Sequence, residues 1–556
     1  MEPPTRPAPP TAGAGAPADP PPVGSPSAFD RNLGSMSRGT AVMLFATIAL
    51  VLLQFLTRVL VTRHITGDQW GEFNLGLALA NLLSLLTAFG IPTATARALA
   101  FEQTFEARAA LVRKALLVSV PVAAASSALV YLFAGRLAAA FPGPDLTGVF
   151  QLFAVSISLT MLSNTLVGIF QGLERAEPNA IFVQILNPAL FLIFTSALLV
   201  AGWGFTGVIW GYVLSWLGAF AALAVYSYAR LPVLLRALST HTFTGDAAAR
   251  VSFLALSATL FGVATLSYLT QYADTILLGL LERGVSGVAT DQIVGQYSSA
   301  MNLTRLLLVG SGTVTFIYLP VSSRLRRERD FPALRQTYVT ITRWIALLTL
   351  PLTFIFVFDP AYSLAFTFGP NQVGGAAALS LLVVANTVSI LLGPSTATLG
   401  GLGETRTVLA YTAYSTVANV VLCVVLIPPY GMIGAAVAWS VARLLFPALA
   451  LWRIYRLHGI TPFAAHFLRP LALTSALLIP FYYLVPVHAS LLVTFGLVAL
   501  PFVVFAAAIL VTHSVDRGDV YFARAAERRF GFLRPIRRLL ESRLAAESDP
   551  AILRAG

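Results

Sequence analysis

Four ionisable side chains lie within long apolar stretches of this 556-residue chain. They are Arg58, Asp274, Arg305 and Arg443. A charged side chain at the centre of a bilayer costs about 2.5–3.5 kcal/mol on insertion scales, so such residues usually face a cavity or a charged partner. The polar side chains expected on the same cavity wall are Gln54, Gln271 and Asn302. The pattern predicts a binding cavity inside a bundle of membrane helices.

Arg58 and Asp274 are predicted at similar depths, near the outer ends of their helices. If those two helices line the axis between two halves of the protein, the two charges face each other. The alternatives are an ion pair that only locks the halves together and an Arg58 side chain that extends outward to the interface. Arg443, expected about one turn from a cytoplasmic loop, and Arg97 are further candidates. The asparagines expected to bond helix to helix are Asn81, Asn164, Asn187, Asn386 and Asn419.

Several kinds of chemistry are excluded by the residue types. Lys114 is the single lysine and follows an arginine, so no Gly-Lys-Ser/Thr phosphate loop exists and this chain is not an ATP-driven pump. Cys423 is the single cysteine, and the six histidines lack the spacing of metal ligands. We therefore expect no metal site, no cofactor and no enzymatic activity.

The elements that must position these residues are membrane helices. Hydrophobic residues make up 57% of the chain, charged residues 11%, and the mean hydropathy is +0.78; soluble proteins average about 25% charged residues. Apolar stretches long enough to span a bilayer are predicted near residues 40–62, 73–95, 115–141, 147–170, 178–201, 205–228, 251–280, 293–320, 337–358, 376–400, 407–428, 432–454, 467–486 and 490–512. The sequence therefore predicts fourteen transmembrane helices.

The net charge of +12 is explained by membrane topology and does not indicate nucleic acid. With a cytoplasmic N-terminus, eighteen arginine and lysine residues fall in or beside the cytoplasmic loops and three in the outer loops. Such a bias is typical of the positive-inside rule. We predict a multi-pass protein of the cell (inner) membrane with both termini in the cytoplasm.

The chain contains an internal duplication. The stretch that begins at Gly67 recurs from Thr290 with an offset of 223 to 224 residues. The matching pairs in this stretch are Asp68 with Asp291, Gln69 with Gln292, Gly71 with Gly295, and Phe73 with Tyr297. Further matches occur at offsets of 217, 229 and 227 residues, which are Gln54 with Gln271, Gln171–Leu173 with Gly400–Leu402, and Gly204 and Gly207 with Gly431 and Gly434. Because each half contributes six helices, the two repeats insert in the same orientation.

These patterns predict an all-α fold of two pseudo-symmetric six-helix lobes plus two extra C-terminal helices. We predict the following segments: a disordered cytoplasmic Pro/Ala/Gly-rich tail at 1–35, an N-lobe at 36–230, an inter-lobe linker at 231–250, a C-lobe at 251–458, helices 13 and 14 at 459–512, and a tail at 513–556. The last of these is basic and amphipathic, which suits a helix on the anionic inner leaflet.

Five motifs carry a family resemblance. They are Gly71–Phe73 with Gly90–Pro92, Phe170–Arg175, Asp274–Gly279, Val294–Tyr297 and Tyr430–Gly434. Together they resemble the polysaccharide-biosynthesis flippases, the O-antigen and lipid-linked oligosaccharide translocases of the multidrug/oligosaccharidyl-lipid/polysaccharide exporter superfamily. The resemblance extends over residues 36–512.

The resemblance implies two lobes that rock about a central cavity lined by helices 1, 2, 7 and 8. The expected cargo is a polyprenyl-pyrophosphate-linked glycan, and cavity arginines suit a pyrophosphate because a guanidinium binds phosphate oxygens bidentately. Membrane lipids and possible glycan polymerases or glycosyltransferases are the expected partners, with no nucleic acid. An ion gradient or the membrane potential would drive transport, and the coupling ion stays open.

Three alternatives remain at this point. A multidrug and toxin extrusion antiporter shares the two-lobed core, but the resemblance to that branch implies twelve helices and acidic cavity residues, whereas this chain has fourteen predicted helices and a mostly cationic set. The resemblance to a lipid II flippase also implies fourteen helices, although the long run of cavity arginines of that family has no clear match in this sequence. A membrane scaffold without transport activity would not need charges inside the membrane.

Overall fold

The computed structural model describes residues 46–47, 49–102, 104–141, 146–175, 177–233, 236, 247–282, 287–484 and 491–514. The predicted tail at 1–35 and residues 515–556 of the predicted C-terminal tail lie outside these ranges. Within them the chain is helical. The N-lobe consists of the first helix (Ala49–Thr62), α2 (Gly67–Ala88), α3 (Ile91–Phe101), α4 (Phe105–Ala138), α5 (Thr147–Gly172), the π-helix η1 (Asn179–Leu186), α6 (Asn187–Val200) and α7 (Gly204–Arg230).

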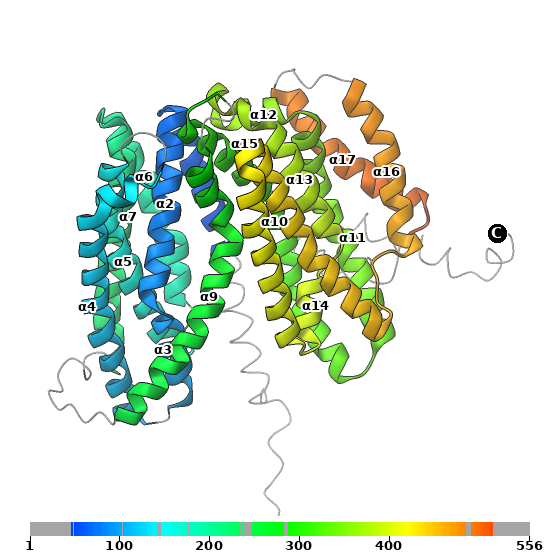
Figure 1. Ribbon diagram of the computed structural model, residues 1–556. Coiled ribbons are helices and arrows are strands. Elements are labelled where there is room, and N and C mark those ends of the chain that lie inside the picture. The colour runs from blue at the N-terminus through cyan, green and yellow to red at the C-terminus, as the bar shows by residue number, and fades with distance from the viewer. Residues whose placement is uncertain are drawn as a thin grey trace, which may run out of the picture.

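The C-lobe and two further helices follow. The C-lobe contains α9 (Ala247–Leu281), α10 (Thr290–Arg327), α11 (Phe331–Phe358), α12 (Pro360–Phe368), the 3-10 helix η2 (Pro370–Gly375), α13 (Ala376–Leu391), α14 (Ser395–Gly401) and α15 (Thr405–His458). The last two helices are α16 (Ala465–Leu484) and α17 (Leu491–Val511), which pack on α11 at the outer side of the C-lobe (Figure 1).

The arrangement agrees with fourteen spans. Among the described residues, nine helices are long and apolar enough to cross a membrane. The longest of them, α15, holds two spans, because Gly431 adopts φ 54° and ψ −131° and reverses the chain direction there. The first helix, α9, α10 and α17 supply the other four spans. The chain is thus an all-α, multi-pass membrane protein.

Several helices begin before the predicted boundaries, among them α2, α4, α9 and α11. The second span begins at Gly67, six residues before the predicted start, because Thr66 and Gln69 form a capping box at its N-terminus. It breaks at Phe89 and Gly90, which both have positive φ, and continues as α3. The α9 helix begins at Ala247, inside the predicted linker, where three consecutive alanines favour helix.

The duplication recurs in the backbone conformation. Gly204 and Gly431, paired by the repeat, have φ values of 53° and 54°. Their partners Gly207 and Gly434 both lie where a Cβ atom would be 2.9 Å or less from another atom of the chain. Each lobe therefore uses the same glycine pair to enter its last helix, the first glycine for a left-handed turn and the second for close packing.

The lobes lie side by side with α9 between them (Figure 1). One end of the bundle, called here the crossing end, carries the start of α2, the start of α10 and α12. The opposite end, called the basic end, carries α3, α14 and the arginine-rich end of α10. The α9 helix contacts α2 and α3 of the N-lobe and α15 and α10 of the C-lobe.

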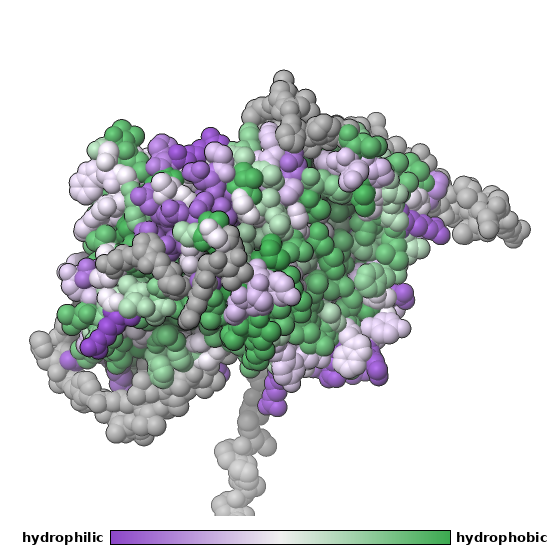
Figure 2. Space-filling model, turned by 45° about the horizontal axis from the view of Figure 1, so that its top comes forward, coloured by the Kyte–Doolittle hydropathy of each residue, from purple (hydrophilic) through white to green (hydrophobic). Residues whose placement is uncertain are grey.

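The outer surface suits a lipid environment. Large apolar side chains such as Leu132 and Val200 are 77% and 90% exposed. Figure 2 shows a broad hydrophobic area over the helices, with hydrophilic residues gathered toward its margins. An apolar area of this size is expected where helices face hydrocarbon rather than water.

Candidate functional site

The two lobes touch most closely where α2 crosses α10. A Cβ atom on Gly71 would lie 1.7 Å from the carbonyl oxygen of Asp291, and a Cβ on Gly295 would lie 2.5 Å from that of Gly67. The two contacts are reciprocal, because Gly71 pairs with Gly295 in the repeat and each of them packs against a backbone carbonyl in the first turn of the other helix. Any side chain at either glycine would push the helices apart, so the crossing requires glycine.

Polar contacts reinforce this closure. The indole nitrogen of Trp70 donates a hydrogen bond to Ser299 Oγ across the lobe interface, at 3.0 Å, and Ser299 donates to Gln372 Oε1 at 3.1 Å. Arg63 donates to the carbonyl oxygen of Phe366 on α12. The N-lobe and C-lobe are thereby sealed against each other at the crossing end.

A pocket of about 600 Å³ opens inside the N-lobe. Its wall comes from the first helix, α2, α5, α6, α7 and α9, and it extends from Arg58 and Trp70 near the crossing end to Gln171 and Asn179 near the basic end. The side chains that line it are mainly amides and aromatic rings, and Arg58 is the one charged residue among them.

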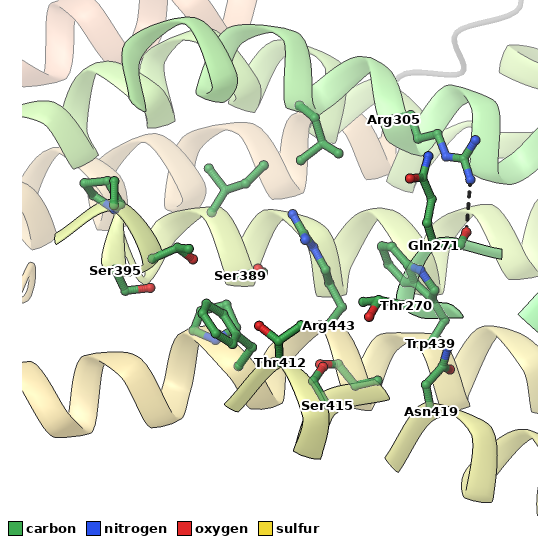
Figure 3. Close-up of a pocket in the computed structure, with 18 of the residues that line it drawn as sticks. Thr270, Gln271, Arg305, Ser389, Ser395, Thr412, Ser415, Asn419, Trp439 and Arg443 are labelled. Carbon is green, nitrogen blue, oxygen red and sulfur yellow. Dashed lines mark hydrogen bonds between the residues drawn. The ribbon is translucent and has the colours of Figure 1, made fainter. Parts of the chain in front are cut away.

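A second pocket, of about 540 Å³, lies in the C-lobe. Its charged residues are Arg305 on α10 and Arg443 on α15, and the hydroxyl groups of Thr412, Ser415 and Ser389 lie around them. Figure 3 shows Arg443 extending from α15 toward the middle of the pocket and Arg305 at one end beside Gln271. Like the N-lobe pocket, it reaches the basic end, at residues 393–397.

The α9 helix separates the two pockets. Gln271 lines the C-lobe pocket and the next residue, Tyr272, lines the N-lobe pocket. Arg305 donates to the backbone carbonyl of Gln271 at 3.3 Å, and its guanidinium carbon lies 5.1 Å from the centre of the Tyr272 ring. Arg58 is close enough to interact electrostatically with both Arg305 and Tyr272. Arg58 thus lines the N-lobe pocket, and Arg305 lines the C-lobe pocket and covers a ring that lines the N-lobe pocket. We call this pair of arginines on either side of Tyr272 the arginine junction.

Two of the predicted cavity residues lie elsewhere. Asp274 is fully buried and accepts a hydrogen bond from the Tyr297 hydroxyl at 2.5 Å. Asn302 is also buried, and neither residue lines the two pockets. Within the described residues Arg58 and Asp274 form no ion pair, so the predicted pairing across the axis is not observed. The similar depth of the two residues did not determine which way each side chain points.

The two further arginine candidates have different surroundings. Arg443 lies fifteen residues before the end of α15 at His458, not one turn from a loop, so the predicted depth was wrong. Its Nε donates to Asn386 Oδ1 at 3.0 Å, and Asn386 donates to the carbonyl of Thr304 at 3.2 Å. Arg97 is exposed on α3 at the basic end and lines neither pocket.

Sequence reasoning missed the amides of the N-lobe pocket. Asn187 and Asn386 bond to neighbouring helices, as expected of polar residues between membrane helices. Asn81 and Asn164, however, face the N-lobe pocket, and within the described chain their side chains make no hydrogen bond. The signal available in the sequence was the spacing of the amides, which recur after seven residues and so lie on one face of α2 and on one face of α5.

Solved structures with this fold are membrane transporters. The lipid II flippase MurJ in an inward closed conformation matches with a TM-score of 0.66 and 14% identity, covering 84% of this chain and 98% of that one. A multidrug resistance MATE family transporter in an inward-facing conformation matches with a TM-score of 0.61 and 16% identity, covering 76% and 98%. A MOP superfamily transporter from Pyrococcus furiosus matches with a TM-score of 0.51 and 17% identity, covering 77% and 96%. At these identities the likeness concerns the fold.

The sequence comparison identifies the family. No curated protein matches the chain. Residues 36–326, however, match the family described as polysaccharide biosynthesis protein. This segment is more than half of the chain, and it includes the whole N-lobe, α9 and nearly all of α10. The chain is therefore a member of the polysaccharide biosynthesis protein family.

Proposed function

We propose that the protein is a flippase that moves a polyprenyl-(pyro)phosphate-linked oligosaccharide from the cytoplasmic to the outer leaflet for cell-surface polysaccharide biosynthesis. The observation that carries this proposal is the arginine junction, where Arg58 and Arg305 line two adjacent pockets inside a membrane protein and Arg305 covers the Tyr272 ring between them. Two guanidinium groups offer paired donors to the oxygens of a diphosphate, which is the anionic part of such a lipid.

The position of the junction suits a lipid-linked cargo. Two like charges in adjacent pockets repel each other, and an anion bound between them would relieve that repulsion. Among the residues that the structure describes, Arg305 makes one hydrogen bond, to the carbonyl of Gln271, so further N–H groups of its guanidinium could bind an anion. The lipid tail would stay in the bilayer while the diphosphate and the glycan entered the pockets.

The lobes would expose the cavity alternately to the two sides of the membrane. The closure at Gly71 and Gly295 blocks the crossing end, whereas both pockets reach the basic end. Because the basic loops are expected in the cytoplasm, this conformation would receive cargo from the cytoplasmic leaflet of the inner membrane, with both chain termini in the cytoplasm. Opening the α2–α10 crossing would then release cargo outward.

Two other cargoes come from the structural relatives. One is lipid II, the cargo in the name of the lipid II flippase MurJ. A multidrug antiporter would instead need acidic groups to bind organic cations and protons. Among the described residues that line the two pockets there is no aspartate or glutamate, which favours an anionic cargo.

A binding measurement tests the proposal. We expect purified protein in nanodiscs to bind a polyprenyl diphosphate, and Arg305→Ala or Arg58→Ala to weaken that binding at least tenfold, which is about 1.4 kcal/mol. Arg305→Lys keeps the charge but loses the bidentate fork, so it should recover only part of the affinity. Arg136→Ala is the matched control, because Arg136 is exposed and lies outside both pockets. Equal affinity in the wild type and the two junction variants would refute the proposal.

A further inference from the structure

We propose that the N-lobe pocket is the glycan subsite and that it selects uncharged, hydroxyl-rich sugars. The inference deepens the proposed function and rests on it, because it assigns the two ends of the cargo to different places. The diphosphate lies at the arginine junction, and the sugars extend from there into the N-lobe.

The first observation is an exposed polar residue on the most enclosed helix of the N-lobe. The α5 helix contacts α2, α3, α4 and α7. Residues 163–170 of α5 are all buried with one exception, Asn164, and the next exposed residue is Gln171. Both line the N-lobe pocket. An exposed amide on a helix with neighbours on four sides needs an internal water-filled space, and the pocket supplies it.

The second observation is the spacing of the amides. On α2 the pocket is lined by Asn74 and Asn81, and on α5 by Asn164 and Gln171. Each pair is seven residues apart, which places both members on one face of the helix. Seven residues span roughly 10 Å along a helix, a distance longer than one pyranose ring. The two helices therefore present amides at two levels of the pocket, which suits a chain of sugars better than a single small ligand.

Most of the amides that line the pocket are free to bind a ligand. Asn74 donates to the carbonyl of Trp70, at 2.7 Å. By contrast, Asn81, Asn164, Asn179 and Gln171 have no side-chain hydrogen bond to any residue that the structure describes. A carboxamide has two N–H donors and an acceptor oxygen, so it can pair with a hydroxyl group, which is also both donor and acceptor.

Aromatic rings complete the subsite. Tyr268 and Tyr272 are stacked with their ring centres 4.7 Å apart, and both line the pocket beside Tyr212 and Trp216. Arg305 covers the Tyr272 ring, so the aromatic wall of the N-lobe pocket begins at the arginine junction. Aromatic faces offer apolar contact to the C–H faces of sugar rings, while the amides meet the hydroxyl groups.

The charge of the pocket argues for neutral sugars. Its lining has no carboxylate that would attract an organic cation. Its single charged residue, Arg58, belongs to the arginine junction, so a uronic acid deeper in the pocket would be desolvated without a cation of its own. The remaining polar groups are neutral and match neutral sugars.

The test compares three lipids on the full-length protein in nanodiscs. The probes are a polyprenyl diphosphate, the same lipid bearing a neutral tetrasaccharide, and the same lipid bearing a tetrasaccharide that contains a uronic acid. We expect the neutral glycan to raise the affinity of the wild type at least tenfold over the bare lipid, and the uronic acid to reduce that gain. Asn81→Ala and Asn164→Ala should remove most of the gain without changing the affinity for the bare lipid.

The controls separate the two proposals. Arg305→Ala should weaken binding of all three lipids. Asn164→Gln keeps the amide and should retain part of the glycan gain, and thermal melting identifies any variant that fails to fold. If the wild type binds the bare lipid but gains nothing from the neutral glycan, or if the asparagine variants keep the full gain, the glycan subsite is refuted. If the wild type binds none of the three lipids, the proposed flippase function fails as well.

Discussion

Replacing Gly71 by alanine should open the crossing end of the molecule. The new Cβ atom would lie 1.7 Å from the Asp291 carbonyl oxygen, where ordinary contacts begin at 3.4 Å, so the α2 and α10 backbones would have to separate locally by about 1.7 Å. For Gly295→Ala the same comparison, against 2.5 Å to the Gly67 carbonyl, gives a separation of about 0.9 Å. Gly71→Ala should therefore have the larger effect.

The expected size of the effect follows from the cost of overpacking. Extra atoms in a well-packed contact cost about 1–3 kcal/mol. That cost falls on the conformation closed at this crossing and is absent when the lobes separate there. A bias of 1–3 kcal/mol shifts a two-state equilibrium by about 5- to 150-fold. Because the two glycines share one contact, the double variant should shift it by less than the product of the single effects.

Spin-label distances provide the assay. With Cys423 replaced by serine, cysteines at the exposed positions Asp68 and Val288 place one label on each lobe at the crossing end. The wild type should show mainly the short distance, and Gly71→Ala should populate a longer one. Gly148→Ala is the matched control, because a Cβ there meets nothing within 4 Å. If the Gly71→Ala distances match those of the control, the crossing is not the closure described here.

Two further perturbations test parts of the structure away from the pockets. Tyr297→Phe removes a buried hydrogen bond to Asp274 and should cost about 1–3 kcal/mol of stability. In the Asp274→Asn background the same substitution should cost clearly less, as measured by thermal unfolding. Equal losses in the two backgrounds would show that the contact contributes nothing. Glu404 accepts from Thr407 at 2.7 Å and pairs with Arg453 at 3.5 Å, and these contacts lower the pKa of its carboxyl group. Contacts that lower the pKa stabilise the fold above the unfolded-state pKa of about 4.3, and this stabilisation is lost as the pH falls through the folded-state pKa. At neutral pH, Glu404→Gln should therefore lower the thermal midpoint, with a loss in the free energy of unfolding of less than about 1 kcal/mol for a surface pair. In strong acid the variant should match the wild type, and a difference that persists in acid would contradict this.

Much of the architecture was predictable because it depends on local patterns. Hydropathy and loop charge predicted a fourteen-helix protein, and the repeat identified Gly71 and Gly295 as equivalent positions. Their reciprocal contact was not predictable, because sequence does not give the distance between two helices. The left-handed turn at Gly431 followed the predicted break between spans, although helical hydrogen bonding continues on both sides of it.

The candidate site was predictable only in part. Arg58 and Arg305 were recognised because a charge in an apolar stretch stands out, and each of them lines a pocket in the structure. Asp274 was expected to face Arg58, but depth along a helix leaves its rotation open. The Tyr297 hydroxyl instead donates to one of the two oxygens of its carboxyl group. Asn164 was expected to join helices. Whether an amide faces a neighbouring helix or a cavity depends on the packing of the whole lobe, which a single sequence does not reveal.

Translocation in proteoliposomes tests the central claim most directly. The measurement follows a fluorescent polyprenyl diphosphate bearing a neutral tetrasaccharide as it moves between leaflets, and the same vesicles are tested for uptake of an organic cation. The account predicts that the wild type moves the lipid but not the cation, that Arg58→Ala and Arg305→Ala each reduce lipid translocation at least tenfold, and that Arg136→Ala does not. Full lipid translocation by the Arg58→Ala, Arg305→Ala double variant, or cation uptake without lipid translocation by the wild type, would contradict it.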